Sequence, residues 1–261
     1  MNNKQNKTIL RHLPNFITSM NLLVGSLAII ILFEKAPNTG NISYSIWAGY
    51  LVFIAAILDF LDGMTARALN AYSDMGKELD SLADLISFGL VPGLIAYKLL
   101  KEALFIFSTP ILEVEYQEIL VLMLAMLIPI FSGLRLAKFN IDTRQSENFR
   151  GLPTPANALF WASLAIIWWG KGNVAFDLVI TDKRFLIAAI VIFSFLLVSE
   201  IPMFSLKFKN FSVKDNLIRY IFLGISLILL LILWIKSIPI IIITYIFISV
   251  VVAIIKKLKK N

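Results

Sequence analysis

Apolar runs of about 20 residues recur along this 261-residue chain and constrain its fold more than any other feature. A helix of that length spans the hydrocarbon core of a bilayer, which is about 30 Å thick. Hydrophobic residues make up 59% of the chain, against about 45–50% in soluble domains. The sequence therefore predicts an all-α, polytopic integral membrane protein, with a single membrane domain over residues 1–261.

The runs predict about eight transmembrane helices, preceded by a short interfacial helix in residues 1–13. We expect a catalytic core at about 10–200 and an extra helical pair at about 215–256. The predicted helices cover about 14–33, 43–69, 78–100, 119–139, 156–169, 185–201, 217–234 and 239–255.

Positive charge dominates the polar segments of the chain. Its 24 Lys and Arg exceed its 17 Asp and Glu, for a net charge of +7. In a membrane protein such an excess is typical of cytoplasmic loops facing anionic lipid, so we expect no nucleic-acid partner. With eight helices and an internal N-terminus, 17 of the 24 basic residues fall inside. The asymmetry predicts that both termini lie in the cytoplasm, with the turn after the second helix on the same side.

Several kinds of chemistry are excluded by composition. The chain has no cysteine, which rules out disulfides, thiolate catalysis and cysteine-ligated metals. His12 is its single histidine, so one chain cannot supply a mechanism that needs two.

Four aspartates fall in two pairs at the ends of neighbouring apolar runs. Asp59 and Asp62 close one run, three residues apart, and Asp80 and Asp84 open the next, four residues apart. Either spacing places both carboxylates on one face of a helix. Carboxylates at membrane depth are costly, so these four need partners or a function.

The neighbouring cations are too few to neutralise this group, since only Arg67 and Lys77 are near in sequence. Divalent cations are the simplest remedy for the repulsion. An all-oxygen site suits Mg²⁺ or Mn²⁺, with Ca²⁺ as a further candidate, rather than zinc. Two such ions about 4 Å apart would suit phosphoryl chemistry. Gly63, Ala66 and Gly76 share the aspartates' helix faces and leave room for a ligand.

Two other interpretations fit isolated aspartates. They could form a proton or cation pathway of a transporter, or they could be helix caps and loop charges. Transporters often carry inverted repeats, and residues 120–261 hold no second copy of the aspartate pattern. Four aspartates with two glycines, an alanine and an arginine at fixed spacing favour a metal-dependent site instead.

The stretch from Asp59 to Asp84 resembles the signature of the CDP-alcohol phosphotransferases, D-x2-D-G-x2-A-R-x8-G-x3-D-x3-D, with every fixed position filled. Within that family, residues 14–21, 80–92 and 135–156 look like the membrane-embedded phosphatidylserine synthases. The resemblance covers roughly residues 10–160. It implies that CDP-diacylglycerol donates its phosphatidyl group to a small alcohol and that CMP leaves.

The resemblance also implies roles for individual residues. Asp59, Asp62 and Asp80 would hold two divalent cations, with Asp84 contributing to the second and acting as the general base. Thr18 and Asn21 also have an alternative role in hydrogen bonding between helices. The residues expected at the CDP-lipid are Thr18, Asn21, Gly63, Ala66, Arg67, Ser73 and Gly76.

The acceptor alcohol is suggested by the flanking segments to be L-serine. Arg135 is the candidate for its carboxylate, because arginine can grip a carboxylate with two hydrogen bonds, and Asn140 is the candidate polar neighbour. Glycerol 3-phosphate is the alternative acceptor, whose phosphate would also need Arg135. The resemblance further suggests a homodimer in the lipid bilayer.

Overall fold

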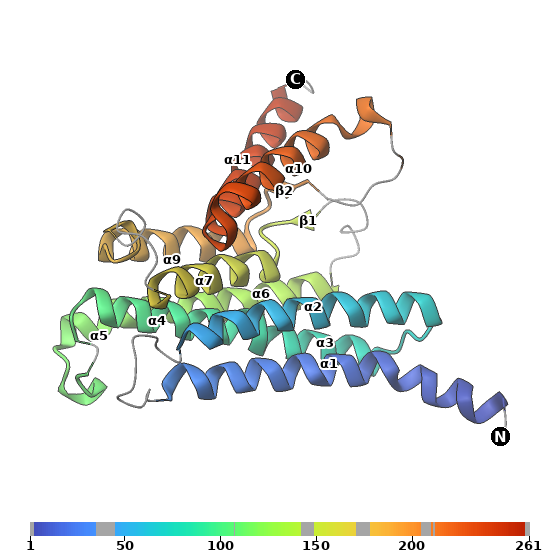
Figure 1. Cartoon of the computed structure of the whole chain (residues 1–261), viewed down its shortest axis with the longest axis horizontal. Helices are drawn as coiled ribbons and strands as arrows, with labels where there is room; N and C mark the ends of the chain where they lie inside the picture. The colour runs from blue at the N-terminus through green and yellow to red at the C-terminus, as the bar shows by residue number, and fades with distance from the viewer. Residues whose placement is uncertain are drawn as a thin grey trace.

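Long helices running side by side build most of the molecule (Figure 1). The computed structural model describes residues 3–34, 45–106, 108–141, 149–170, 178–204, 210 and 212–258. Its α-helices are α1 (Asn3–Phe33), α2 (Ser45–Leu69), α3 (Asp74–Asp84), α4 (Val91–Ala103), α5 (Tyr116–Met123), α6 (Leu127–Ile141), α7 (Thr154–Trp169), α9 (Lys183–Val198), α10 (Val213–Leu233) and α11 (Ser237–Leu258).

Short non-α turns join some of these helices into longer rods. A π-helical turn, Leu85–Leu90, connects α3 to α4, and a 3₁₀ turn, Leu124–Met126, connects α5 to α6. Another 3₁₀ turn, Trp234–Lys236, separates α10 from α11. Two short strands, β1 (Phe149–Arg150) and β2 (Pro202–Met203), pair antiparallel.

Five segments within the described residues are long and apolar enough to cross a membrane. They are His12–Phe33, Ser45–Leu69, Asp74–Ala103, Tyr116–Ile141 and Val213–Ile255. The predicted all-α, multi-pass membrane fold is therefore confirmed. The last segment contains both α10 and α11, while α7 and α9 have 16 residues each, shorter than a usual span. The count of eight spans stays a prediction.

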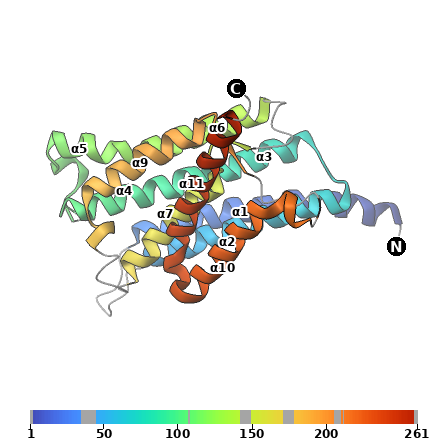
Figure 2. The same cartoon turned by 90° about the horizontal axis from the view of Figure 1, so that it is seen from above.

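Helix α7 lies at the centre of the assembly. It packs against α2, α4 and α11, and its side chains are apolar almost all round, which is typical of a helix enclosed by others. Phe160 and Trp161 are almost completely buried. The α10–α11 hairpin crosses over α7 and β2 rather than joining the parallel rods (Figure 2).

Two helices begin earlier than their hydrophobic pattern predicts. Helix α3 begins at Asp74 rather than near residue 78, because Ser73 caps it and accepts a hydrogen bond from the Gly76 amide at 3.0 Å. Helix α10 begins at Val213, so Lys214 and Arg219, expected in a basic loop, are helical.

The predicted interfacial helix and the first membrane helix form one continuous helix through Pro14. The interruption expected at Pro92-Gly93 lies just before it, in the π-helical turn. A Cβ at Gly93 would lie 2.6 Å from Pro129 Cδ, so this position is a close-packing point between α4 and α6.

Candidate active site

Three of the four aspartates converge where the end of α2 meets α3. Asp59, Asp62 and Asp80 each offer a carboxylate oxygen, and these oxygens lie within 4.8 Å of one another. α1 packs against both α2 and α3, which closes one side of the group. The predicted helix faces thus bring the carboxylates together from two separate helices.

The aspartates have few partners among the described residues. The Thr18 hydroxyl lies 2.7 Å from Asp62 Oδ2 and donates a hydrogen bond to it. Asp80 Oδ1 and Asp84 Oδ1 are buried and accept no hydrogen bond from any described residue. Buried acceptors without partners are costly, so a ligand must supply the missing contacts.

The donor set fits a hard divalent cation. All the available ligand atoms are carboxylate oxygens, which Mg²⁺ and Mn²⁺ prefer. The orphaned oxygens of Asp80 and Asp84 are of the same kind. The residues present therefore suit the cations that the sequence predicts.

A cavity of about 220 Å³ opens beside the cluster. No described atom lies within 4 Å of the Cβ position at Gly63, so the glycine leaves open space there. The lining comes from α1, α2 and the start of α3. Its residues are Pro14, Asn15, Thr18, Asp62, Gly63, Ala66, Ala71, Tyr72, Ser73, Gly76, Lys77 and Asp80.

The first turn of α3 faces this cavity through Ser73, Gly76 and Lys77. A Cβ at Gly76 would lie 2.8 Å from Asn15 Oδ1 and 2.9 Å from Ser73 Oγ, so a larger residue would require these two side chains to move. Free amide groups at a helix N-terminus favour anions. The cavity thus combines room for a ligand, carboxylates for cations and a helix end suited to phosphate.

Asp84 interacts with both the carboxylate cluster and a buried arginine. It is 8% exposed, and it has electrostatic interactions with Asp59, Asp80 and Arg135. Arg135 is also 8% exposed; its Nη1 lies 3.5 Å from Thr154 Oγ1, while its Nε has no partner among the described residues.

Further buried polar groups lie on α6, which carries this arginine, and on α7, which carries Thr154. Ser132, one turn before Arg135 on α6, and Asn157, one turn after Thr154 on α7, are fully buried. The Ser132 hydroxyl and the Asn157 amide find no hydrogen-bond partner in the described part of the chain. This side of the site therefore offers a guanidinium and neutral polar groups opposite a carboxylate.

An ion-pair cluster covers the outer edge of this side. Glu200, just after α9, accepts hydrogen bonds from Lys138 on α6 and from Arg150 Nη1 on β1, the latter at 2.8 Å. These two hydrogen bonds lower the pKa of the exposed Glu200 carboxyl to about 2. The carboxylate therefore stays charged across the physiological range.

Not every predicted site residue reaches the cavity. Asn21 is fully buried with its amide unpartnered among the described residues, and it does not line the cavity. Arg67 is exposed and lies outside the lining as well. Asn140 Nδ2 donates to Ser81 Oγ at 2.8 Å, which ties the end of α6 to α3 rather than to Arg135.

The cavity also includes residues outside the predicted site, Lys77 and Tyr72. Asn15 lines it as well, and this residue shares the three-residue spacing of Thr18 and Asn21 that predicts contact with the nucleotide. A signal for Lys77 existed, because the Ser73 cap places it in the first turn of α3. Thr154 and Asn157 carried no such signal, since their approach to α6 depends on the packing of α7.

Comparison with known proteins identifies this arrangement. The model that describes CDP-alcohol phosphatidyltransferases matches residues 11–198. The chain belongs to this family. The match includes all four aspartates and Arg135 and ends before α10, so the α10–α11 hairpin lies outside the matched region of this CDP-alcohol phosphatidyltransferase.

Similar proteins include several CDP-diacylglycerol–serine O-phosphatidyltransferases. That of Bacillus subtilis is 36% identical over 146 residues, covering 56% of this chain and 71% of the relative. That of Helicobacter pylori strain 26695 is 33% identical over 220 residues, covering 81% and 80%. That of Mycobacterium leprae is 33% identical over 208 residues, covering 74% of this chain and 58% of the relative. CDP-alcohol phosphatidyltransferases depend on divalent cations, in keeping with the aspartate cluster.

Proposed function

We propose that this protein is a phosphatidylserine synthase, which transfers the phosphatidyl group of CDP-diacylglycerol to L-serine and releases CMP. The observation that carries the proposal is the placement of Asp84. This buried carboxylate interacts electrostatically both with the Asp59–Asp62–Asp80 cluster and with the buried Arg135. Such an arrangement suits a phosphate donor at the cluster and a carboxylate-bearing acceptor at the arginine.

Asp59, Asp62 and Asp80 would hold the divalent cations, with Asp84 contributing to the second. When bound, Mg²⁺ or Mn²⁺ neutralises the diphosphate and stabilises charge on the departing CMP. The Thr18 hydroxyl donates to Asp62 Oδ2, which fixes the orientation of this carboxylate. We therefore assign Thr18 a positioning role in addition to its place in the cavity wall.

The cytidine diphosphate would occupy the cavity bordered by Gly63, Ala66, Ser73 and Gly76. The missing side chains of the glycines allow close approach, and the first-turn amides of α3 can donate to phosphate oxygens. Arg67 and Asn21 remain predicted contacts of the CDP-lipid. The exposed position of Arg67 suits a contact outside the cavity rather than within it.

The acceptor would lie between Asp84 and Arg135. Arg135 would bind the serine carboxylate and so orient the hydroxyl toward Asp84. Asp84 would take the hydroxyl proton as the serine oxygen forms its bond to the phosphatidyl phosphorus. The bond from that phosphorus to the CMP oxygen breaks, and CMP leaves in a single displacement. Asn140 remains a predicted polar neighbour, and Thr154 is nearer to the guanidinium.

The site would face the cytoplasm, where cytidine nucleotides and free amino acids are found. The excess of Lys and Arg in the predicted inner segments supports this orientation, with both termini inside. A homodimer stays a prediction.

Glycerol 3-phosphate is the alternative acceptor, and one observation favours it. Arg135, Lys138 and Arg150 all border one small cavity, and several cations together are typical of a phosphate site. A cation transporter that uses the aspartates is the alternative from a different class.

The test is CMP release by the purified protein in detergent. It would receive CDP-diacylglycerol, Mn²⁺ or Mg²⁺, and one acceptor at a time: serine, glycerol 3-phosphate, inositol or choline. We expect CMP release with serine only and its loss on chelation. Release with another acceptor would contradict the serine assignment but keep the reaction class. No release with any acceptor would favour the transporter.

A further inference from the structure

A small cavity beside the proposed acceptor site is bordered by three cationic side chains. Arg135 and Lys138 come from one face of α6, and Arg150 comes from β1. The opposite wall is the last turn of α9, from Leu197 to Ser199. Arginine and lysine arranged in this way usually bind phosphate. Serine, however, carries one carboxylate and no phosphate, so the charge of this cavity needs an explanation.

Glu200 already forms hydrogen bonds with Lys138 and Arg150, the two outer cations of this cavity. Its Oε1 accepts a hydrogen bond from Lys138 and its Oε2 accepts one from Arg150. Both carboxylate oxygens are thereby used, and each outer cation has an anionic partner. Arg135 differs, because its Nε has no partner within the described residues and its guanidinium is buried beside Asp84.

The backbone holds Glu200 in this position. Arg150 pairs with Pro202 in the β1–β2 ladder, and the Gly151 amide donates to Ile201 O at 3.0 Å. Gly151 has a φ of +75°, and a Cβ there would lie 2.5 Å from Leu197 O. Most exposed ion pairs contribute little because two long side chains must be ordered. Here the backbone contact reduces that cost.

The cavity that remains is about 10 Å³, roughly the space of one water molecule. A phosphate group therefore has no room between Lys138 and Arg150 while Glu200 binds both. It would have to displace the carboxylate, which is itself an anion fixed in place.

We propose that Glu200 determines acceptor specificity by acting as an internal anion. It neutralises Lys138 and Arg150. Of the three cations that border this cavity, Arg135 then remains to bind an acceptor, which selects a carboxylate over a phosphate monoester. The inference rests on the proposed function, because it places the acceptor at Arg135.

The experiment compares the wild-type protein with Glu200→Gln, using glycerol 3-phosphate as an inhibitor of serine-dependent CMP release. We expect the inhibition constant of glycerol 3-phosphate to fall about tenfold in the variant, while KM for serine changes less than about threefold. Adding Lys138→Gln to Glu200→Gln should return the constant toward the wild-type value. Glu113→Gln is the control, since it removes one exposed negative charge at the other end of the bundle.

Glu200→Asp keeps the charge and should keep weak inhibition, which a purely structural role does not predict. Equal inhibition of the wild-type and Glu200→Gln proteins would overturn the proposal, and so would tight inhibition of the wild-type protein. Tight inhibition of the wild-type protein can be measured without any variant, so this outcome does not depend on whether a variant folds. A binding measurement distinguishes failure of this proposal from failure of the proposed function. Thermal stabilisation by glycerol 3-phosphate should be greater in Glu200→Gln than in the wild-type protein, whether or not serine supports turnover. An equal or smaller stabilisation would contradict the role of Glu200.

Discussion

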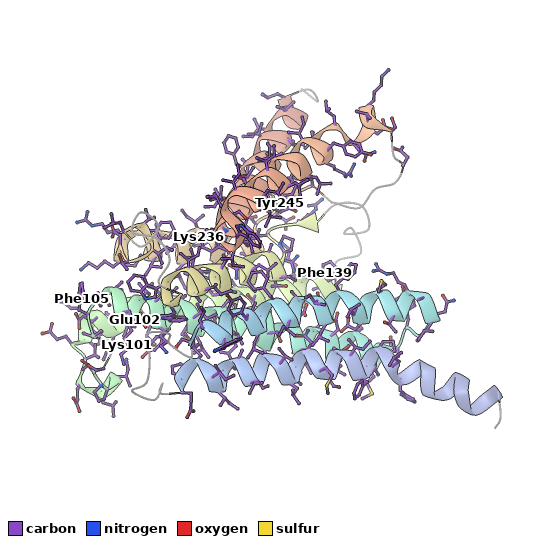
Figure 3. All side chains as sticks on the ribbon, viewed as in Figure 1. Lys101, Glu102, Phe105, Phe139, Lys236 and Tyr245 are labelled. Carbon is purple, nitrogen blue, oxygen red and sulfur yellow. The ribbon has the colours of Figure 1, made fainter. Side chains whose placement is uncertain are left out.

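Charged side chains are withdrawn from water at both ends of the helix bundle, but among the described residues those at one end have more hydrogen-bond partners than those at the other. Glu102 lies at the end where α4 finishes, whereas Phe139, beside Arg135, lies toward the other end (Figure 3). Lys98 donates to Leu32 O at 2.7 Å and to the Ser45 hydroxyl, and it lies 5.2 Å from the centre of the Trp169 ring.

The Glu102 carboxylate also has hydrogen-bond partners at that end. Its carboxylate accepts hydrogen bonds from the indole nitrogens of Trp168 and Trp169, the latter at 2.9 and 3.1 Å. At the opposite end, Asp80 Oδ1 and Asp84 Oδ1 have no hydrogen-bond partner in the described part of the chain. A buried charge with all its contacts inside the protein stabilises the fold, whereas one without them indicates a ligand.

The largest effect that this comparison predicts follows from changing the aspartates. Asp59→Asn or Asp84→Asn should lower CMP release about 1,000-fold or more, because each removes a cation ligand or the proposed base. Thermal stability in detergent should not fall, since the substitution removes repulsion between carboxylates. Near-normal turnover in either purified variant would contradict the cation and base assignments, and Glu113→Gln is the control for charge.

A smaller effect is expected at Arg135, which tests whether the guanidinium, whose Nε has no partner among the described residues, binds the acceptor. Arg135→Ala should raise KM for serine about 30-fold, the equivalent of about 2 kcal/mol, with a smaller change in KM for CDP-diacylglycerol. Arg135→Lys keeps the charge and should recover part of the loss. An equal rise of both KM values would remove Arg135 from the acceptor site, and unchanged kinetics would make it structural.

The sequence predicted the helices and the aspartate motif that form the candidate site. The spacing of Asp59, Asp62, Asp80 and Asp84 predicted that their carboxylates share helix faces, and three of them do meet within 4.8 Å. The apolar runs predicted the helical membrane fold. Both predictions use local periodicity, which depends on neighbours a few residues apart.

The partners of the charges could not be predicted in the same way. Glu200 meets Lys138 and Arg150, which precede it by 62 and 50 residues, through the pairing of two-residue strands too short to show periodicity. Glu102 lies beyond the predicted helix over about 78–100, yet the structure places it on α4 against tryptophans of α7. Such contacts depend on how helices pack, and single-sequence patterns carry little information about packing.

The fully partnered end should respond in stability and not in turnover. Lys98→Met removes a charged donor from the Leu32 carbonyl and from the Ser45 hydroxyl, which should cost about 2 kcal/mol. The midpoint of thermal unfolding in detergent should fall, while CMP release per folded molecule stays unchanged. Lys101→Met, one turn away on α4, serves as the control. A large loss of turnover in folded Lys98→Met protein would show that the two ends are not separate.

The smallest effect concerns Glu200, which is exposed to solvent but accepts hydrogen bonds from Lys138 and Arg150. It is therefore intermediate between the charges at the two ends of the bundle. Its pKa falls to about 2 because Lys138 and Arg150 donate hydrogen bonds to the carboxylate. A lowered pKa means that the stabilisation is present above the unfolded-state pKa of 4.5 and is lost as pH falls toward 2. The difference in unfolding midpoint between the wild-type and Glu200→Gln proteins should therefore be constant from about pH 8 to 5 and shrink below about pH 4. A difference that vanishes between pH 7 and 5 would mean that the carboxylate does not hold both cations, because an anion fixed by two donors resists protonation there.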